Sequence, residues 1–196
     1  MSKALVGCGL VALLIVLIVG LMAVGTYNRL VGLEEGVEAA WSQVENVYQR
    51  RADLIPNLVE TVRGAADFEQ ETFTSVTEAR ARVGQLQFDG APGAAELQEF
   101  QAAQGELSAA LSRLLLVVEN YPQLRATEAF RDLQVQLEGS ENRIAVERRR
   151  FNEVAQQFNT ARRRFPTVLI AGALGFDEKA YFEAEAGAEE APAVQF

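Results

Sequence analysis

Residues 4–27 read ALVGCGLVALLIVLIVGLMAVGTY, and this apolar stretch decides how the rest of the chain is organised. It contains no charged side chain, and as a helix it would rise about 36 Å against about 30 Å for the hydrocarbon core of a bilayer. Its many Leu, Ile and Val side chains favour insertion into lipid. The stretch therefore predicts an N-terminal transmembrane anchor within residues 1–29.

Two other N-terminal signals match parts of this stretch. Ala23-Val24-Gly25 has the small-x-small pattern of a signal-peptide cleavage site, and Leu5-Val6-Gly7-Cys8 resembles a lipobox. However, the apolar run exceeds the roughly 7 to 15 residues of an ordinary signal peptide, and a lipobox cysteine follows its apolar region rather than preceding it. We expect a retained anchor.

The charges beside the anchor bear on its orientation. Lys3 and the α-amino group precede it and Arg29 follows it, whereas the acidic Glu34 and Glu35 have little influence on topology. This balance favours an N-terminus inside the cell and a bundle on the extracytoplasmic side.

The composition argues against several function classes. A formal net charge of −9 argues against duplex nucleic acid as a partner. The chain has no histidine and one cysteine, so the commonest general base is absent, and carboxylate-bridged metal sites in bundles pair Glu with Glu-x-x-His. Phosphate-binding loops and nucleophile motifs are also absent. We predict a protein that is not an enzyme, with no catalytic, cofactor-binding or metal-binding residues.

After the anchor, apolar residues recur with the three-and-four spacing of helices. The periodic stretches cover residues 31–62, 68–86, 94–119 and 127–165. Residues 88–93 (FDGAPG) and Asn120-Tyr121-Pro122 have the composition of turns. We predict an all-α fold, in which the transmembrane helix precedes an elongated antiparallel up-down bundle of about four long helices over residues 30–176.

The composition changes again after residue 176. Residues 177–196 contain six acidic side chains and one lysine among mostly small residues. We expect an acidic tail that is mostly disordered.

Several motifs occur in order along the chain: YNRLV at 27–31, RRADLIPNLV at 50–59, VENYPQL at 118–124 and ENRIA at 141–145. Together they resemble the LemA family, and the similarity continues to YFE at 181–183. The resemblance implies a single-pass bacterial membrane protein with an antiparallel helical bundle, whose molecular activity is not established.

The chain departs from the family pattern at three places. Phe151-Asn152 and Phe158-Asn159 stand where the family usually has Tyr-Asn, and Phe68-Glu69 stands for a frequent His-Glu. No role of a phenol or an imidazole is therefore carried over. The family is commonly drawn with its N-terminus outside, which is opposite to the charge balance, so both orientations stay open.

Four polar residues lie on or beside the apolar stripe of the last periodic stretch: Glu141, Arg148, Asn152 and Asn159. Within each pair, Glu141 with Arg148 and Asn152 with Asn159, a separation of seven places both residues on one helix face. We predict an interior polar layer that fixes the register of the helices, with a ligand site inside the bundle as the alternative.

Arg162, Arg163 and Arg164 end the same stretch and precede an apolar segment, residues 165–176, that is too short to cross a bilayer. The last helix of an up-down bundle returns toward the membrane. The triplet is therefore a candidate contact for anionic lipid or a partner. Packing of the apolar segment on the end of the bundle is the alternative.

These features predict a non-catalytic protein of the bacterial plasma (inner) membrane that presents its bundle for protein–protein interaction or self-assembly at the cell envelope. The alternative is a membrane-tethered sensor or ligand-binding bundle. We expect no cofactor.

Overall fold

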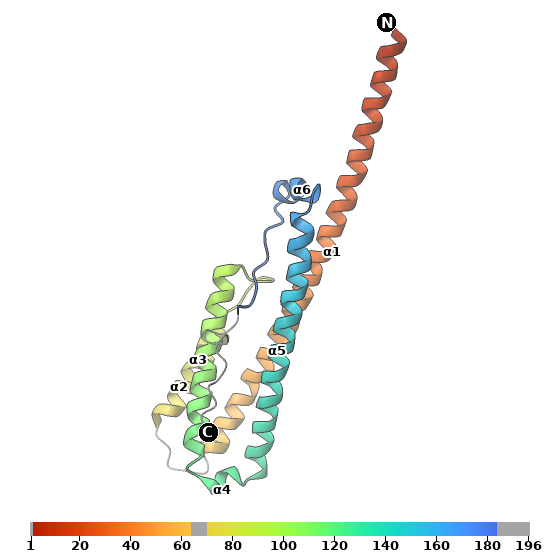
Figure 1. Cartoon of the computed structure of the whole chain (residues 1–196). Coiled ribbons are helices and arrows are strands. Elements are labelled where there is room, and N and C mark those ends of the chain that lie inside the picture. The colour runs from red at the N-terminus through yellow and green to blue at the C-terminus, as the bar shows by residue number, and fades with distance from the viewer. Residues whose placement is uncertain (1, 64–69, 184–196) are drawn as a thin grey trace, which may run out of the picture.

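The protein is a helical bundle from which one long helix projects (Figure 1). The computed structural model describes residues 2–63 and 70–183. The helices are α1 (Ser2–Arg63), α2 (Gln70–Gln85), α3 (Ala94–Val118), α4 (Pro122–Arg125), α5 (Glu128–Arg163) and α6 (Thr167–Ala173). The described residues contain no strand, and the all-α prediction is confirmed.

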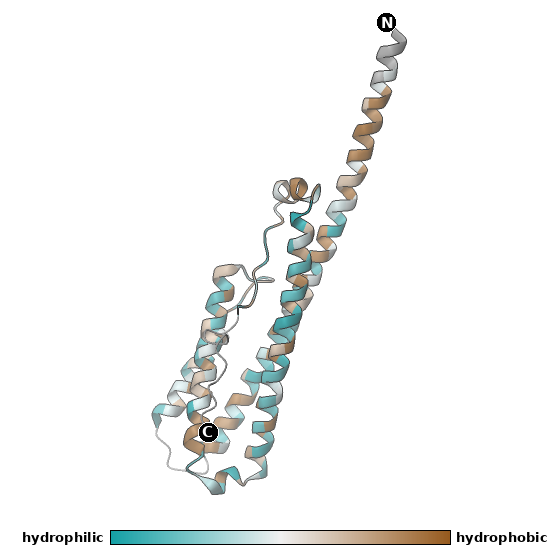
Figure 2. Cartoon of the chain, viewed as in Figure 1, coloured by the Kyte–Doolittle hydropathy of each residue, from teal (hydrophilic) through white to brown (hydrophobic). Residues whose placement is uncertain are grey.

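Helix α1 joins the predicted anchor to the bundle without a break, so the boundary expected at residue 29 is not an interruption in the structure. Its N-terminal part stands clear of the other helices, and Figure 2 shows that this part is strongly hydrophobic. The large apolar side chains between Leu10 and Val24 are exposed. Among the described residues, α1 is the one helix that is long and apolar enough to cross a membrane.

Helix α1 also continues through Pro56, which has no N–H to donate. The carbonyl of Ala52, four residues earlier, therefore lacks its usual helical partner. Arg80 of α2 fills this place, because its Nε donates a hydrogen bond to the Ala52 oxygen at 3.1 Å. The proline thus creates an acceptor that ties α2 to α1.

The bundle consists of two antiparallel helix pairs, α1 with α5 and α2 with α3. Small residues bring α1 close to α5: a Cβ atom on Gly36 would lie 3.5 Å from a methyl group of Val154. Ala40 and Ala155 are buried nearby. Neighbouring helices run in opposite directions, as the short connections predicted.

The loop between α2 and α3 reverses the chain at residues 86–93. Gly90 has a φ of +91°, a conformation that glycine adopts without strain. The next N–H, that of Ala91, donates to Glu38 Oε2 at 2.6 Å and so fixes the loop on α1.

The core has two apolar parts. The part nearer the projecting helix is centred on Trp41, whose ring lies 5.4–6.2 Å from four phenylalanine rings, those of Phe88, Phe100, Phe151 and Phe182. The part farther from it is largely aliphatic and includes Ile55, Leu58, Leu107 and Leu114. We refer to these as the proximal core and the distal core.

After α6 the chain returns along the bundle without helix or strand through residues 176–183, the C-terminal segment. Phe176 and Phe182 are each 6% exposed and belong to the proximal core. The expectation of disorder from residue 177 is therefore wrong for residues 177–183. Residues 184–196, the rest of the predicted tail, lie outside the described residues.

Candidate functional site

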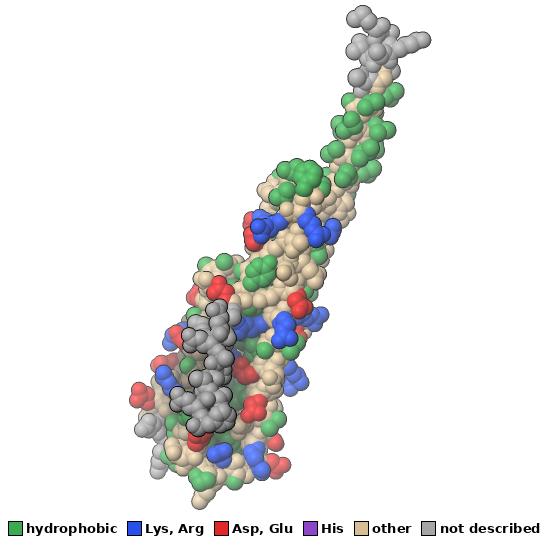
Figure 3. Space-filling view, in the orientation of Figure 1, with side chains coloured by type: hydrophobic (Ala, Val, Ile, Leu, Met, Phe, Trp, Pro, Cys, Tyr) green, Lys and Arg blue, Asp and Glu red, His purple; other side chains and the backbone are tan. Residues whose placement is uncertain are grey.

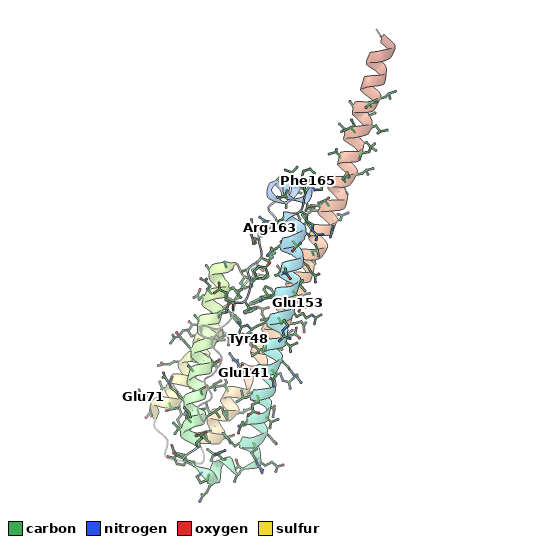
Figure 4. The ribbon with its side chains drawn as sticks, in the orientation of Figure 1. Tyr48, Glu71, Glu141, Glu153, Arg163 and Phe165 are labelled. Carbon is green, nitrogen blue, oxygen red and sulfur yellow. The ribbon has the colours of Figure 1, made fainter. Side chains whose placement is uncertain are left out.

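Arg51 occupies the level at which the proximal and distal cores meet. Its side chain is 2% exposed. Nη1 donates to Ser108 Oγ at 3.1 Å and to Glu141 Oε1 at 2.7 Å, and Nη2 donates to Gln104 Oε1. These four residues, from α1, α3 and α5, form what we call the polar layer; Figure 4 labels Glu141 at this level of the bundle.

Two buried donors in the polar layer, Arg51 Nε and Gln104 Nε2, have no hydrogen-bond partner in the described part of the chain. Other atoms of Arg51 and Gln104 line a cavity of about 210 Å³, with Gln101, Ile144 and Arg148 among its other walls. Such a volume holds several water molecules or a small polar molecule. The chemistry that this site offers is hydrogen-bond donation to an acceptor atom.

The polar layer also constrains how the helix pairs meet. Buried polar groups are costly unless they are paired, so Arg51 requires its acceptors from α3 and α5 at this level. A shift of one helix turn would place a buried guanidinium among apolar side chains. The pair of Arg51 with Glu141 is not fully enclosed, because the Glu141 side chain is 52% exposed.

The structure separates the four residues that the sequence predicted as one interior layer. Glu141 contacts Arg51, whereas Arg148, Asn152 and Asn159 contact the C-terminal segment. The prediction of a single layer is therefore wrong in its membership. Spacing placed each pair on one face correctly, but it contained no information on what those faces pack against.

Asn152 and Asn159 bind the backbone of the C-terminal segment in the same way. Asn152 Nδ2 donates to Phe182 O at 2.9 Å, and Phe182 N donates to Asn152 Oδ1 at 2.8 Å. Asn159 Nδ2 donates to Lys179 O at 2.8 Å and receives the Lys179 N–H on Oδ1 at 2.9 Å. Each side-chain amide thus supplies the donor and the acceptor that a neighbouring strand would supply. Asn159 Nδ2 also donates to Tyr181 Oη at 2.9 Å.

Arg148 completes the attachment of this segment. Its Nη2 donates to Glu183 O at 3.0 Å, and its guanidinium carbon lies 4.8 Å from the centre of the Phe182 ring. The cation–π contact and the hydrogen bond together hold the end of the described segment against α5.

The arginine triplet divides into one internal contact and two exposed side chains. Arg162 Nε donates to Phe176 O at 2.5 Å, and Arg162 Nη1 lies 3.8 Å from Glu178 Oε2. Arg163 and Arg164 are exposed. Arg162 therefore holds the C-terminal segment, and two of the three predicted contact residues face outward.

In a comparison with known protein families, the model of the LemA family matches residues 40–196. The chain belongs to the LemA family. This agrees with the motifs described above, and the matched range includes the polar layer and the C-terminal segment.

Curated relatives carry two names. Magnetosome protein MamQ of Magnetospirillum gryphiswaldense is 29% identical over 178 residues, which covers 80% of this LemA-family chain and 64% of MamQ. Protein LemA of Metamycoplasma hominis is 23% identical over 161 residues, covering 82% of this chain and 70% of the relative. The chain thus spans less than two thirds of MamQ. Neither LemA nor MamQ is a known enzyme family.

In this LemA-family chain, sequence reasoning missed Arg51, Gln104 and Ser108. A signal for Arg51 was present, because it lies between Tyr48 and Ile55 on the apolar stripe of α1. Gln104 likewise interrupts a run of apolar positions in α3. Groups of three or more His, Cys, Asp or Glu that could hold a metal ion are not found in the described ranges.

Proposed function

We propose that this LemA-family chain is a non-catalytic, single-pass protein of the bacterial plasma membrane, which presents its bundle for protein–protein interaction or self-assembly at the cell envelope. The observation that carries the proposal is the continuity of α1, a 62-residue helix that begins in the apolar stretch and ends in the distal core. Such a helix supports the bundle as a stalk on the membrane.

A groove on α5 is the surface that best suits a protein partner. It has a volume of about 690 Å³ and is open to solvent, and the C-terminal segment forms one wall. Arg149, Glu153 and Tyr181 line it, so both signs of charge lie beside an aromatic ring. Tyrosine and arginine are both enriched at protein-binding surfaces.

The test is site-specific photocrosslinking of the full chain in its membrane. A photoreactive residue at Glu153 is expected to crosslink to a second copy of the chain or to one defined partner protein. The same residue at Asp132, near the other end of α5, is the control. Equal crosslinking at the two positions, or none at Glu153, contradicts the proposal.

We further propose that the bundle lies on the extracytoplasmic side, on the charge balance around the anchor. A reporter that is active only outside the cytoplasm, fused after Phe196, should be active, and a reporter that fluoresces only inside should be dark. The reverse pattern would place the bundle in the cytoplasm and would contradict the orientation proposed from the charge balance.

A second candidate function is a ligand-binding bundle, and the two unpartnered donors of the polar layer favour it. A carboxylate or carbonyl oxygen in the adjoining cavity would accept hydrogen bonds from Arg51 Nε and Gln104 Nε2. A ligand at 100 times its dissociation constant would stabilise the fold by about 2.7 kcal/mol.

Thermal denaturation of the full chain with added small carboxylates tests this second function. A rise in Tm that disappears in Gln104→Leu would support it. Gln156→Leu, an exposed position on α5, is the control for the loss of an amide. If no carboxylate raises the Tm, the cavity holds water and the second candidate fails.

A further inference from the structure

Helix α6 lies at the end of α5, at the level where α1 leaves the bundle (Figure 1). Its buried side packs on that part of α1: Ala171 is 1% exposed and belongs to the proximal core with Leu30. Just beyond α6, the ring of Phe176 lies 5.7 Å from that of Tyr27. Tyr27 ends the apolar stretch that is the candidate membrane span. Helix α6 is therefore placed beside the point at which α1 would emerge from lipid.

Helix α6 and the residues that flank it expose large apolar side chains. Phe165 is 81% exposed, Leu169 66% and Leu174 54%. Together with Val168 they form what we call the apolar cap. Figure 3 shows apolar side chains at the top of the bundle, next to those of the projecting helix, and Figure 4 labels Phe165 there. Exposed apolar patches of this kind mark sites that are covered by a partner or by a membrane.

Positive charge lies directly beneath the apolar cap. Arg163 and Arg164, both exposed, immediately precede Phe165, and Figure 3 shows basic side chains at this level. A cavity of about 270 Å³ between α1 and α5 is lined by Arg164, Arg29 and Thr160. Two guanidinium groups and a hydroxyl match the oxygen atoms of a phosphate group.

We propose that the apolar cap inserts into the interfacial region of the bilayer, while Arg29, Arg163 and Arg164 bind the phosphates of anionic lipid headgroups. This inference rests on the proposed membrane span of α1, whose apolar side chains lie next to the cap (Figure 3). An apolar surface next to basic side chains is the combination that seats interfacial helices on anionic membranes. The chain then meets the bilayer at two places, the span and the cap, and the second contact limits how far the bundle tilts.

The experiment places single nitroxide labels on the full chain in lipid nanodiscs. The cysteine of the apolar stretch is first removed by Cys8→Ala, and labels are attached at Leu169→Cys in the cap and Val146→Cys on α5. Val146 is 57% exposed and lies away from α6, so it is the matched control. Collisions with oxygen, which partitions into lipid, are compared with collisions with a water-soluble nickel complex.

The label at position 169 is expected to be accessible to oxygen and shielded from nickel, whereas the label at 146 shows the reverse. Equal nickel accessibility at 169 and 146 overturns the proposal. Phe165→Cys provides a second position in the cap, and circular dichroism confirms that each labelled chain is folded.

A label at Val16→Cys, within the apolar stretch, separates this inference from the proposed function. If position 16 is in lipid and position 169 is in water, the anchor stands and the cap proposal fails. If position 16 is itself exposed to nickel, the single-pass proposal fails.

The headgroup part is tested by lipid composition. Adding phosphatidylglycerol to phosphatidylcholine nanodiscs should increase the shielding of position 169 from nickel. The double variant Arg163→Gln with Arg164→Gln should lose this response, while Arg149→Gln with Arg150→Gln, an exposed pair farther along α5, should keep it. An unchanged response in the first variant refutes the assignment of these arginines.

Discussion

Arg80 of α2 donates a hydrogen bond to the carbonyl of Ala52, the acceptor that Pro56 leaves without a helical partner in α1. The interaction joins residues 28 positions apart and replaces a local bond with a tertiary one. It explains how a proline is accommodated within a helix that continues to Arg63.

We predict that Arg80→Met lowers the free energy of unfolding by about 1 to 2 kcal/mol, because it leaves a partly buried carbonyl unpaired. In a Pro56→Ala background the substituted alanine supplies a backbone N–H that restores the helical bond, so the same Arg80 substitution should cost less. Thermal denaturation of the full chain in detergent, for both single variants and the double variant, measures this coupling. Equal losses in the two backgrounds would show that Arg80 does not compensate for Pro56.

The paired hydrogen bonds of Asn159 predict a local effect on the C-terminal segment. Asn159→Ala should lower the free energy of unfolding by about 2 to 3 kcal/mol, because two backbone groups of Lys179 lose their partners. Hydrogen exchange should accelerate at residues 179–182. Asn142→Ala, at an exposed position of α5, should change neither quantity. Unchanged exchange at 179–182 in Asn159→Ala would contradict the role of this side chain.

Gly90 and Gly139 should respond to alanine in opposite directions. Gly90 has a positive φ, and an added Cβ would lie 2.8 Å from Glu38 Oε2, so Gly90→Ala should destabilise the fold by about 1 to 2 kcal/mol. Gly139 lies within α5 with nothing within 4 Å of an added Cβ, so Gly139→Ala should stabilise it by about 0.5 to 1 kcal/mol. Melting curves of the two variants measure these changes. A lower stability in both variants would rule out backbone conformation as the cause.

Partial burial raises the pKa of the Glu45 carboxyl above its ordinary value, and the negative charge of Glu38 adds to the increase. A carboxyl group whose pKa is raised in the folded state destabilises the fold only when the group is ionised. This loss of stability is absent below the pKa that the group has in the unfolded state. It develops as the pH rises through the pKa that the group has in the folded state.

Glu45→Gln should therefore raise the Tm at neutral pH and leave it unchanged in acid. Glu99→Gln, at an exposed position of α3, is the control for the general loss of one negative charge. Melting curves across the acid range provide the measurement. A Tm for Glu45→Gln that matches the native chain at neutral pH would show that burial of Glu45 has no energetic consequence.

The helices were predictable because they depend on local patterns. The turn at residues 88–93 and the junction at 120–122 carry their own glycine and proline signals, and the structure places breaks between helices at both. The continuity of α1 followed from the absence of a glycine-proline cluster between the predicted anchor and the first bundle helix, and the single Pro56 does not end the helix.

The C-terminal segment was not predictable from its own residues. It contains three acidic and three aromatic side chains without helical or strand periodicity. Its position depends on Asn152, Asn159 and Arg148 of α5, a helix that ends at Arg163. The buried apolar side chains of this segment are Phe176 and Phe182. The polar layer was missed for a related reason. Arg51 binds Glu141, which lies 90 positions away in the chain, and the periodicity within one helix does not show which residues of another helix it contacts.

If α1 spans the membrane as proposed, its unbroken course makes the span a lever rather than a flexible tether. From Tyr27 to Arg63 the helix extends for about 54 Å, so a span tilted by about 20° would displace the far end of the bundle sideways by about 18 Å. Because the helix has no joint at the membrane surface, rotation of the span about its axis turns the bundle with it. Any one face of the proposed span and the groove on α5 therefore keep a fixed angular relationship, and whatever orients one of them also orients the other.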